Sequence, residues 1–318
     1  MAVDAAALLT FSAIGNREDL SDTIYRIDPT ETPFMSGIEK TKATAVLHEW
    51  QTQALAAATS TNSNLEGDDA VTDTATVTTR LGNICQISDK VARVSGTQRS
   101  VDHAGRDDEL DYQAMLKGLE LRRDMETTLL ANQGRQSGSP STARGVGAVL
   151  SWLNSNTSKG TNGSDPSSAQ LGISTRTDGS ARAFTESQLK TVLQSCWNNG
   201  GKPDVIMVGG FNKQQFSTFT GRATPTEDTR AKKITAAVDA YESDFGTLKV
   251  VPNRFQRSRD VLVLQMDLWA MAYLPGRNMI SLPLAKTGDS DRRQVLCEYT
   301  LEARQEKGSG GVFDCTSA

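Results

Sequence analysis

Side chains that commonly carry catalysis are few in this chain, and they form no recognisable constellation. The two histidines, His48 and His103, are far apart in the sequence. A lone imidazole has no neighbouring group to adjust its proton affinity. The sequence also contains no HExxH zinc motif, no nucleophile elbow and no closely spaced metal ligands. We therefore expect no catalytic residue, no bound metal and no cofactor.

Two glycine-rich segments could in principle bind a phosphate or a nucleotide. Gly145-Val146-Gly147 resembles the start of a dinucleotide loop, but Leu150 takes the place of the third glycine. Val208-Gly209-Gly210 ends a predicted strand and begins a predicted helix, where free N–H groups can hold an anion. It lacks the lysine of a phosphate loop, so a tight strand–helix turn explains it better. An α/β enzyme with an anion site near Gly209-Gly210 remains one alternative.

Acidic residues gather at two places, and both have a simple structural explanation. Paired carboxylates can act as an acid and a base or hold a cation. Neither cluster is next to an apolar segment that would form a pocket. The first predicts a solvated turn and the second the beginning of a helix, where the helix dipole favours negative charge. The clusters are Glu66, Asp68 and Asp69, and Asp107, Asp108 and Glu109.

Composition and charge limit the possible partners. The 318 residues carry a formal net charge of −4. A free nucleic-acid binder normally has a basic excess, so we expect any contact with DNA to be passive containment. The four cysteines are far apart, which predicts reduced thiols in a protein made in a cytoplasm. The apolar run 261–274 is interrupted by Gln265 and Asp267 and is too short to cross a membrane. The first basic residue is Arg17, which argues against a signal peptide.

The elements that must position these residues begin with two extended segments. Residues 1–46 predict an irregular arm, because Pro29 and Pro33 end any helix there. Residues 47–95 predict a long two-stranded excursion. Its strands lie at 46–50 and 74–79, and its turn is at Glu66-Gly67-Asp68-Asp69. A lone hairpin is marginally stable in water, so we expect it to pack on another surface. A disordered linker is the alternative for this segment.

The remaining chain predicts one long helix and a mixed domain. Apolar residues recur at helical spacing over 104–133, a helix of roughly 43 Å in which Arg122 and Glu126 could pair. Residues 134–182 are a loop-rich connection. Residues 183–285 alternate helical and strand patterns, which indicates a sheet flanked by helices. Residues 294–304 alternate as a half-buried strand does.

Local sequence motifs, in this order, resemble a known family. The segment Asp19-Leu20-Ser21-Asp22-Thr23-Ile24-Tyr25-Arg26-Ile27-Asp28-Pro29-Thr30-Glu31-Thr32-Pro33-Phe34 resembles the N-terminal signature of the SU10-type capsid proteins of tailed bacteriophages. His48-Glu49-Trp50-Gln51, the strand 204–208 followed by Phe211-Asn212-Lys213, and the C-terminal segment 306–314 are also similar to that family. The order of arm, hairpin, long helix, α/β domain and returning strand matches the Hong Kong 97-type capsid fold.

The resemblance implies an α+β Hong Kong 97-type phage capsid fold and a specific division of the chain. Residues 1–46 would be the N-terminal arm and 47–95 an extended β-hairpin loop. Residues 96–182 would form the peripheral domain, with a spine helix and a loop-rich connection, and 183–285 the axial α/β domain. Residues 286–318 would be the return strand of the peripheral domain.

The resemblance also implies partners and a location. Copies of the chain would form the pentamers and hexamers of an icosahedral or prolate shell around double-stranded DNA. A portal, and a scaffold or decoration protein, would be further partners. Assembly would take place in the bacterial host cytoplasm, and the chain would end in the virion capsid. An encapsulin, which is a cellular compartment with the same fold, is the alternative within structural proteins.

Several residues are candidates for contacts between subunits. The founding member of this fold joins its subunits covalently through a lysine of the extended loop. Residues 48–83 contain no lysine here and have a net charge of −4, from five acidic residues and Arg80. We therefore expect non-covalent contacts, in which the acidic turn meets basic residues of the long helix on a neighbour. The candidate contact residues are Glu66, Asp68, Asp69, Arg122, Arg123, Trp50 and Phe34.

Overall fold

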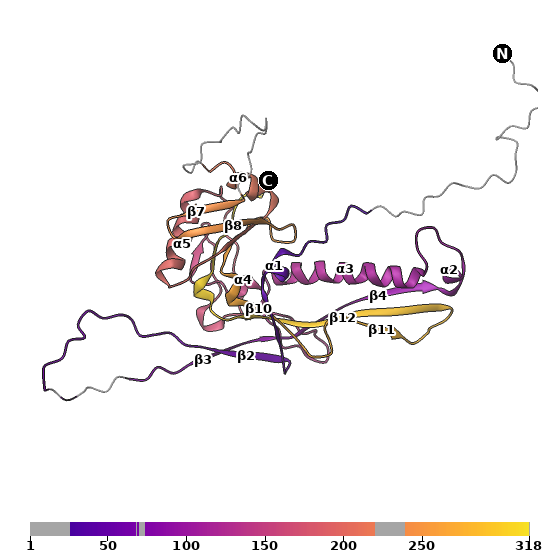
Figure 1. The fold of residues 1–318 in the computed structure, drawn as a ribbon, viewed down its shortest axis with the longest axis horizontal. Helices are drawn as coiled ribbons and strands as arrows, with labels where there is room; N and C mark the ends of the chain where they lie inside the picture. Colours follow the sequence, from indigo (N-terminus) through magenta and orange to yellow (C-terminus); the bar gives the residue numbers. More distant parts are fainter. Residues whose placement is uncertain (1–25, 68, 70–73, 220–238, 318) are drawn as a thin grey trace, which may run out of the picture.

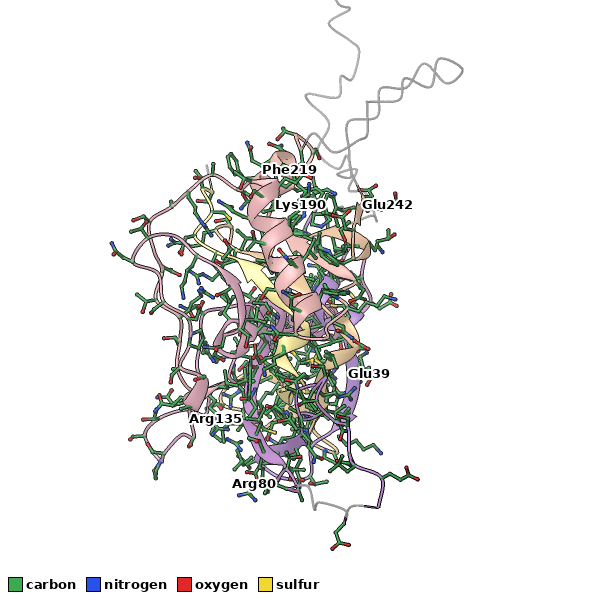
Figure 2. All side chains as sticks on the ribbon, turned by 90° about the vertical axis from the view of Figure 1, so that its left-hand side faces the viewer. Glu39, Arg80, Arg135, Lys190, Phe219 and Glu242 are labelled. Carbon is green, nitrogen blue, oxygen red and sulfur yellow. The ribbon has the colours of Figure 1, made fainter. Side chains whose placement is uncertain are left out.

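The computed structural model describes residues 26–67, 69, 74–219 and 239–317. In Figure 1 the described chain forms a body with a sheet at each end, and a thin two-stranded excursion extends from it. Figure 2 views the same body from the left-hand side of Figure 1. Arg80 lies there at the excursion end, and Lys190 and Glu242 lie at the opposite end.

A five-stranded sheet is built around one long strand, β12 (Ser290–Ala303). The N-terminal half of β12 pairs antiparallel with β4 (Gln86–Ser95) and β11 (Ile280–Leu284). Its C-terminal half pairs with β10 (Trp269–Tyr273), which in turn pairs in parallel with β1 (Glu39–Lys42). Segments that are far apart in the sequence therefore share one sheet.

The long helix α3 (Glu109–Leu129) packs along this sheet, against β4 and β12 (Figure 1). Its buried side includes Leu121, Met125 and Leu129. The sequence predicted a helix over 104–133, and the structure is shorter at both ends. Asp108 is extended and its carboxylate accepts a hydrogen bond from the Leu110 N–H, so it caps the helix there. At about 1.5 Å per residue, 21 residues span about 31 Å.

A six-stranded sheet forms the other part of the body. Its strands, in spatial order, are β5 (Asn156–Ser158), β13 (Gly310–Val312), β9 (Val261–Leu264), β6 (Val205–Val208), β8 (Gly246–Pro252) and β7 (Ala240–Ser243). The helices α5 (Glu186–Asn198) and α6 (Gly210–Phe216) share a buried apolar cluster with it. A capping box at Thr185 starts α5.

One apolar cluster joins the two sheets. It includes Phe34, Trp152, Trp269 and Tyr299, all with 0% exposure. Short elements contribute to it or connect the strands: α1 (Pro33–Gly37), α2 (Gly96–Ser100), α4 (Val149–Trp152), η1 (Ser168–Gln170), η2 (Met266–Leu268) and η3 (Glu306–Gly308). Because the sheets share a core, the body should resist unfolding as one unit.

Three strands differ from the sequence-based expectation. The excursion consists of β2 (Leu47–Thr52) and β3 (Thr79–Ile84), so its return strand begins where the predicted one ends. β4, predicted as part of the excursion, lies in the five-stranded sheet because Ala92 and Val94 alternate toward α3. β13 lies in the six-stranded sheet, although its segment was predicted to stay with β12. Gly310 permits this, since a Cβ there would collide with the Asn156 carbonyl oxygen.

The four cysteines are free, in agreement with the predicted reduced thiols, and all four are buried. Burial raises the pKa of the Cys196 and Cys315 thiols to about 12 and that of Cys85 and Cys297 to about 11. These thiols therefore stay protonated and unreactive near neutral pH. None of the helices in the described ranges combines the length and the apolar character that a membrane crossing requires.

Candidate subunit-contact surfaces

The base of the excursion is fixed to the body by aromatic and polar contacts. The indole Nε1 of Trp50 donates a 2.8 Å hydrogen bond to the Ala303 carbonyl oxygen, and its ring lies 5.3 Å from the Trp152 ring. His48 Nε2 is 3.3 Å from a carboxylate oxygen of Glu302. The indole N–H and one ring face of Trp50 are therefore used in contacts within its own chain. Its contact with a neighbour stays a prediction.

Beyond this base the excursion leaves the body. From residue 53 to residue 78 the described residues form no strand, and the trace extends away from both sheets (Figure 1). Leu55, Leu65 and Val77 are 97%, 80% and 90% exposed. These apolar side chains are therefore available for another molecule to cover.

The tip of the excursion is the acidic turn that the sequence predicted. Gly67 has a φ of +84°, a conformation that glycine adopts without strain. Glu66 and Asp69 beside it are exposed. Asp68, the third predicted contact residue of this turn, lies outside the described residues. The exposed tip therefore presents carboxylates and no lysine.

The described part of the arm packs against its own chain, through a buried carboxylate. The N–H groups of Phe34 and Met35 donate to the two carboxylate oxygens of Glu126 on α3, at 2.8 and 2.9 Å. Asn253, which follows β8, donates its amide to the same carboxylate at 2.7 Å. Glu126 is 0% exposed, and burial raises its pKa while these three donors oppose the shift. One side chain therefore joins the arm, the long helix and the second sheet.

Two sequence-based expectations about this region are wrong. Phe34 was expected to contact another subunit, but it is 0% exposed and its ring meets Trp269 edge-on at 6.4 Å. Arg122 was expected to pair with Glu126, but that carboxylate points inward to the arm and Asn253. Helical spacing predicts which residues are neighbours, whereas it cannot reveal which of them the tertiary fold buries.

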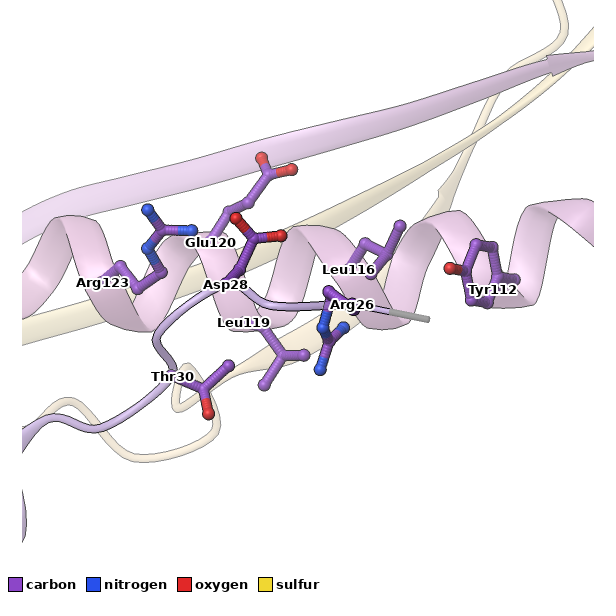
Figure 3. A pocket seen from close by; sticks show the side chains of 8 residues that line it. All are labelled: Arg26, Asp28, Thr30, Tyr112, Leu116, Leu119, Glu120 and Arg123. Atoms are coloured by element: carbon purple, nitrogen blue, oxygen red, sulfur yellow. The ribbon is translucent and has the colours of Figure 1, made fainter. Parts of the chain in front are cut away.

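The two candidate arginines on α3 point to different surroundings. Arg123 lies beside a cavity of about 270 Å³ that Figure 3 shows between the arm and α3. Asp28 and Thr30 of the arm line it together with Leu119 of the helix. The Arg123 guanidinium is also 5.6 Å from the Phe255 ring centroid. The described arm therefore covers part of its own helix.

Arg122 lines a separate polar pocket of about 140 Å³ beside α1. Lys40 of β1 lines the same pocket. Neither cation has an ion-pair partner among the described residues, although most of the arginines in the body do. The sequence could not show that Arg122 and Lys40 line the same pocket, because α1, β1 and α3 converge only in the folded chain.

The remaining predicted features have structural roles. Gly209 joins β6 to α6 as a tight turn, as predicted. His103 Nε2 is 3.0 Å from the Gln98 amide nitrogen, in the loop before α3. Across the residues that the structure describes, no three His, Cys, Asp or Glu side chains converge as metal ligands would.

Comparison with known sequences identifies relatives over nearly the whole chain. The model of the SU10 major capsid protein family matches residues 7–316. The major capsid protein of Escherichia phage Phieco32 is 25% identical over 342 aligned residues, which cover 96% of this chain and 96% of that protein.

Solved structures share the fold at low sequence identity. A chain of the cyanophage A-1(L) capsid asymmetric unit superposes with a TM-score of 0.64 at 13% identity, covering 96% of this chain and 98% of that one. A chain from Gordonia phage Cozz gives 0.62 at 8% identity, covering 99% and 97%. The holo-SrpI encapsulin complex of Synechococcus elongatus PCC 7942 gives 0.52 at 10% identity, covering 93% of each chain. These matches confirm the predicted Hong Kong 97-type fold.

Proposed function

The chain belongs to the SU10 major capsid protein family, and we propose that its copies form the pentamers and hexamers of a closed shell around the double-stranded DNA of a tailed bacteriophage. The observation that carries this proposal is the excursion between β2 and β3. It is fixed at its base by Trp50, but Leu55, Leu65 and Val77 are left almost uncovered by the described part of the chain.

Covering these residues would stabilise an assembly. Burying apolar surface contributes about 25 cal/mol per Å². Leu55, Leu65 and Val77 are almost fully exposed in the single chain, so each would contribute when a neighbour packs on it. A closed shell repeats this contact at every subunit, which makes a small individual contribution large in sum.

The charges of the excursion favour a basic neighbouring surface. The tip carries Glu66, Asp68 and Asp69, and Arg122 and Arg123 of α3 are the candidates to receive it. Each exposed pair would contribute about 0–1 kcal/mol. Reversing the charges of Asp68 and Asp69 is expected to weaken assembly most at low salt. Unchanged assembly across salt concentrations would contradict this contact.

The shell is proposed to hold without a covalent bond from the excursion. Residues 48–83 contain no lysine, so they have no amine for the cross-link that the fold's founding member makes. Further proposed partners are a portal and a scaffold or decoration protein. The proposed location is the virion capsid, after assembly in the host cytoplasm. A structural role without catalysis is part of the same proposal.

Electron microscopy of the expressed full chain tests the proposal directly. We expect closed particles, and discrete small oligomers under all conditions would contradict it. An encapsulin would also form particles, since the SrpI chain shares the fold. Neighbouring genes separate the two: a terminase and a portal support a phage shell, and a cargo enzyme supports a compartment.

A further inference from the structure

The pocket beside α1 has the composition of an anion site. Four segments line it: α1, β1, α3 and the loop after β10. Lys40 and Arg122 supply two positive charges, and Thr32 and Ser36 supply hydroxyl groups. No aspartate or glutamate is among the described residues that line it. Two cations brought together without a counter-ion repel each other, so binding an anion would stabilise this arrangement.

The size of the pocket restricts the anion. Its volume is about 140 Å³, about half that of the cavity between the arm and α3. A carboxylate at the end of a side chain fits such a space, and Arg122 can bind it with two parallel N–H donors. Duplex DNA is matched by extended basic surfaces with many phosphate contacts. Two cations in a small recess, in a chain with a net charge of −4, fit a side chain better.

We propose that this pocket receives the acidic tip of the excursion from a second copy of the chain. The tip is the part of the excursion with adjacent carboxylates, at Glu66, Asp68 and Asp69. With roughly a dozen residues in each leg, the excursion can reach about 40 Å from its base. The proposal rests on the proposed shell function and adds the receiving site: Lys40 and Arg122 together, with Thr32 and Ser36 as hydrogen-bond donors.

This placement also gives the arm a role in assembly. Thr32 and Ser36 lie at the two ends of α1, the segment whose start is held by Glu126. A receiving site built partly from α1 exists only when the arm is docked on α3. A copy whose arm is not docked would therefore receive its neighbour's tip more weakly.

Zero-length cross-linking between isotopically distinct copies tests the proposal. Full-length chain labelled with ¹⁵N is mixed with unlabelled chain, assembled, and treated with a water-soluble carbodiimide, which joins a carboxylate to an amine that touches it. Mass spectrometry of the digest should find a mixed-isotope product between the tip and Lys40. Lys40→Arg keeps the charge and removes the amine, so it should assemble normally and lose the product. Lys202→Arg, at an exposed lysine outside the pocket, should keep it.

A charge exchange provides the second measurement. Arg122→Glu should raise the chain concentration needed for assembly about tenfold, which corresponds to about 1.4 kcal/mol. Adding Glu66→Arg to the same chain should restore assembly at least in part. The control Lys202→Glu makes the same charge change outside the pocket and should leave assembly unchanged.

The outcomes separate this proposal from the proposed function. Shells that form without the tip–Lys40 product would overturn the receiving site and leave the shell function standing. The product without shells would support the site and contradict the shell. The absence of both would contradict both. If wild-type shells lack the product and the Arg122→Glu shells retain less duplex DNA, the occupant of the pocket is DNA and the proposal is wrong.

Discussion

At the scale of single residues, Glu126 decides how the arm is held. Its carboxylate accepts three hydrogen bonds from neutral donors and no ion pair is recorded for it in the described part of the chain. Charge-assisted hydrogen bonds of this kind contribute about 1.5–3 kcal/mol. A buried donor left without its acceptor costs a similar amount.

Glu126→Gln therefore should destabilise the chain by about 3 kcal/mol, because its NH₂ group would face N–H donors. Urea unfolding measures this loss, and limited proteolysis near Pro33 should show earlier cleavage of the arm. Glu120→Gln is the matched control, since Glu120 lies on the same helix and makes exposed pairs with Lys117 and Lys90. Equal arm protection in both variants would contradict the role of Glu126.

Asp260 predicts a pH dependence of stability. Burial raises its pKa to about 6, although Arg257, Arg176 and Arg259 oppose the shift and Asp178 adds to it. The folded chain therefore binds a proton more tightly than the unfolded chain, and this stabilisation is lost as pH rises through about 6. Asp260→Asn has no such proton, so its stability relative to wild type should rise between about pH 4 and pH 6.5. The change should be at most about 3 kcal/mol.

Urea unfolding of the unassembled wild-type and Asp260→Asn chains, across that pH range, gives the comparison. Arg257, Arg176 and Arg259 also lose a nearby counter-charge in the variant, so its absolute stability at one pH is not diagnostic. The diagnostic quantity is how the difference in unfolding free energy between the variant and wild type changes with pH. A difference that stays constant from pH 4 to 6.5 would show that Asp260 is ionised throughout.

At the scale of elements, we expect the body to fold normally without the outer part of the excursion. β2 and β3 pair from Leu47 with Ile84 to Thr52 with Thr79, and the exposed residues beyond them touch neither sheet's core. Replacing residues 54–77 with an Asn-Gly turn should keep the short hairpin, because this pair favours a tight two-residue connection. The melting temperature should change by only about 2 °C. Particles should no longer appear by electron microscopy.

A length-matched variant shows whether the apolar side chains or the reach matter. Leu55→Ser, Leu65→Ser and Val77→Ser together keep the length and the charge of the excursion. We expect this triple variant to fold normally and to assemble only at higher protein concentration. If the chain with the Asn-Gly turn still forms normal shells, the excursion makes no contact that assembly needs.

The elements predicted well are those whose signals are local. The apolar stripe indicated α3, and the segment 205–216 indicated a strand, a glycine turn and a helix. β4 and β13 were misplaced because their partners, β12 and β5, are distant in the sequence. Composition and turn chemistry carry no information about such pairing.

The candidate contact residues also divide into those that local sequence could indicate and those that depend on contacts between distant segments. The acidic tip with Glu66 follows from local sequence, and it is exposed as expected. Phe34 was misjudged because an apolar residue in an arm can fill its own core as well as a neighbour's. The pocket of Lys40 and Arg122 depends on four segments that meet only in three dimensions. No pattern within one segment could have indicated it.

At the scale of the whole molecule, the acidic excursion and the basic pocket lie on different parts of the chain. The projecting segment 48–83 has a net charge of −4 and no lysine. Lys40 and Arg122 lie beside α1, and neither has an ion-pair partner among the residues that the structure describes. The thiols are buried within the folded chain, so they are not available for disulfides between subunits. We propose that these two surfaces meet in the assembly, and the excursion has no lysine amine for a covalent bond between them.

This arrangement predicts shells that are held by weak contacts alone. Purified shells, heated in sodium dodecyl sulfate without a reducing agent, should give a single band at the mass of one chain. A salt titration should lower their melting temperature, because the screening length falls from about 10 Å at 0.1 M to about 3 Å at 1 M. The Arg122→Glu shells should lose less stability on the same titration, since the screened attraction is already absent. A ladder of covalent oligomers in the gel would require a lysine outside the excursion to form the bond, and it would overturn the non-covalent shell.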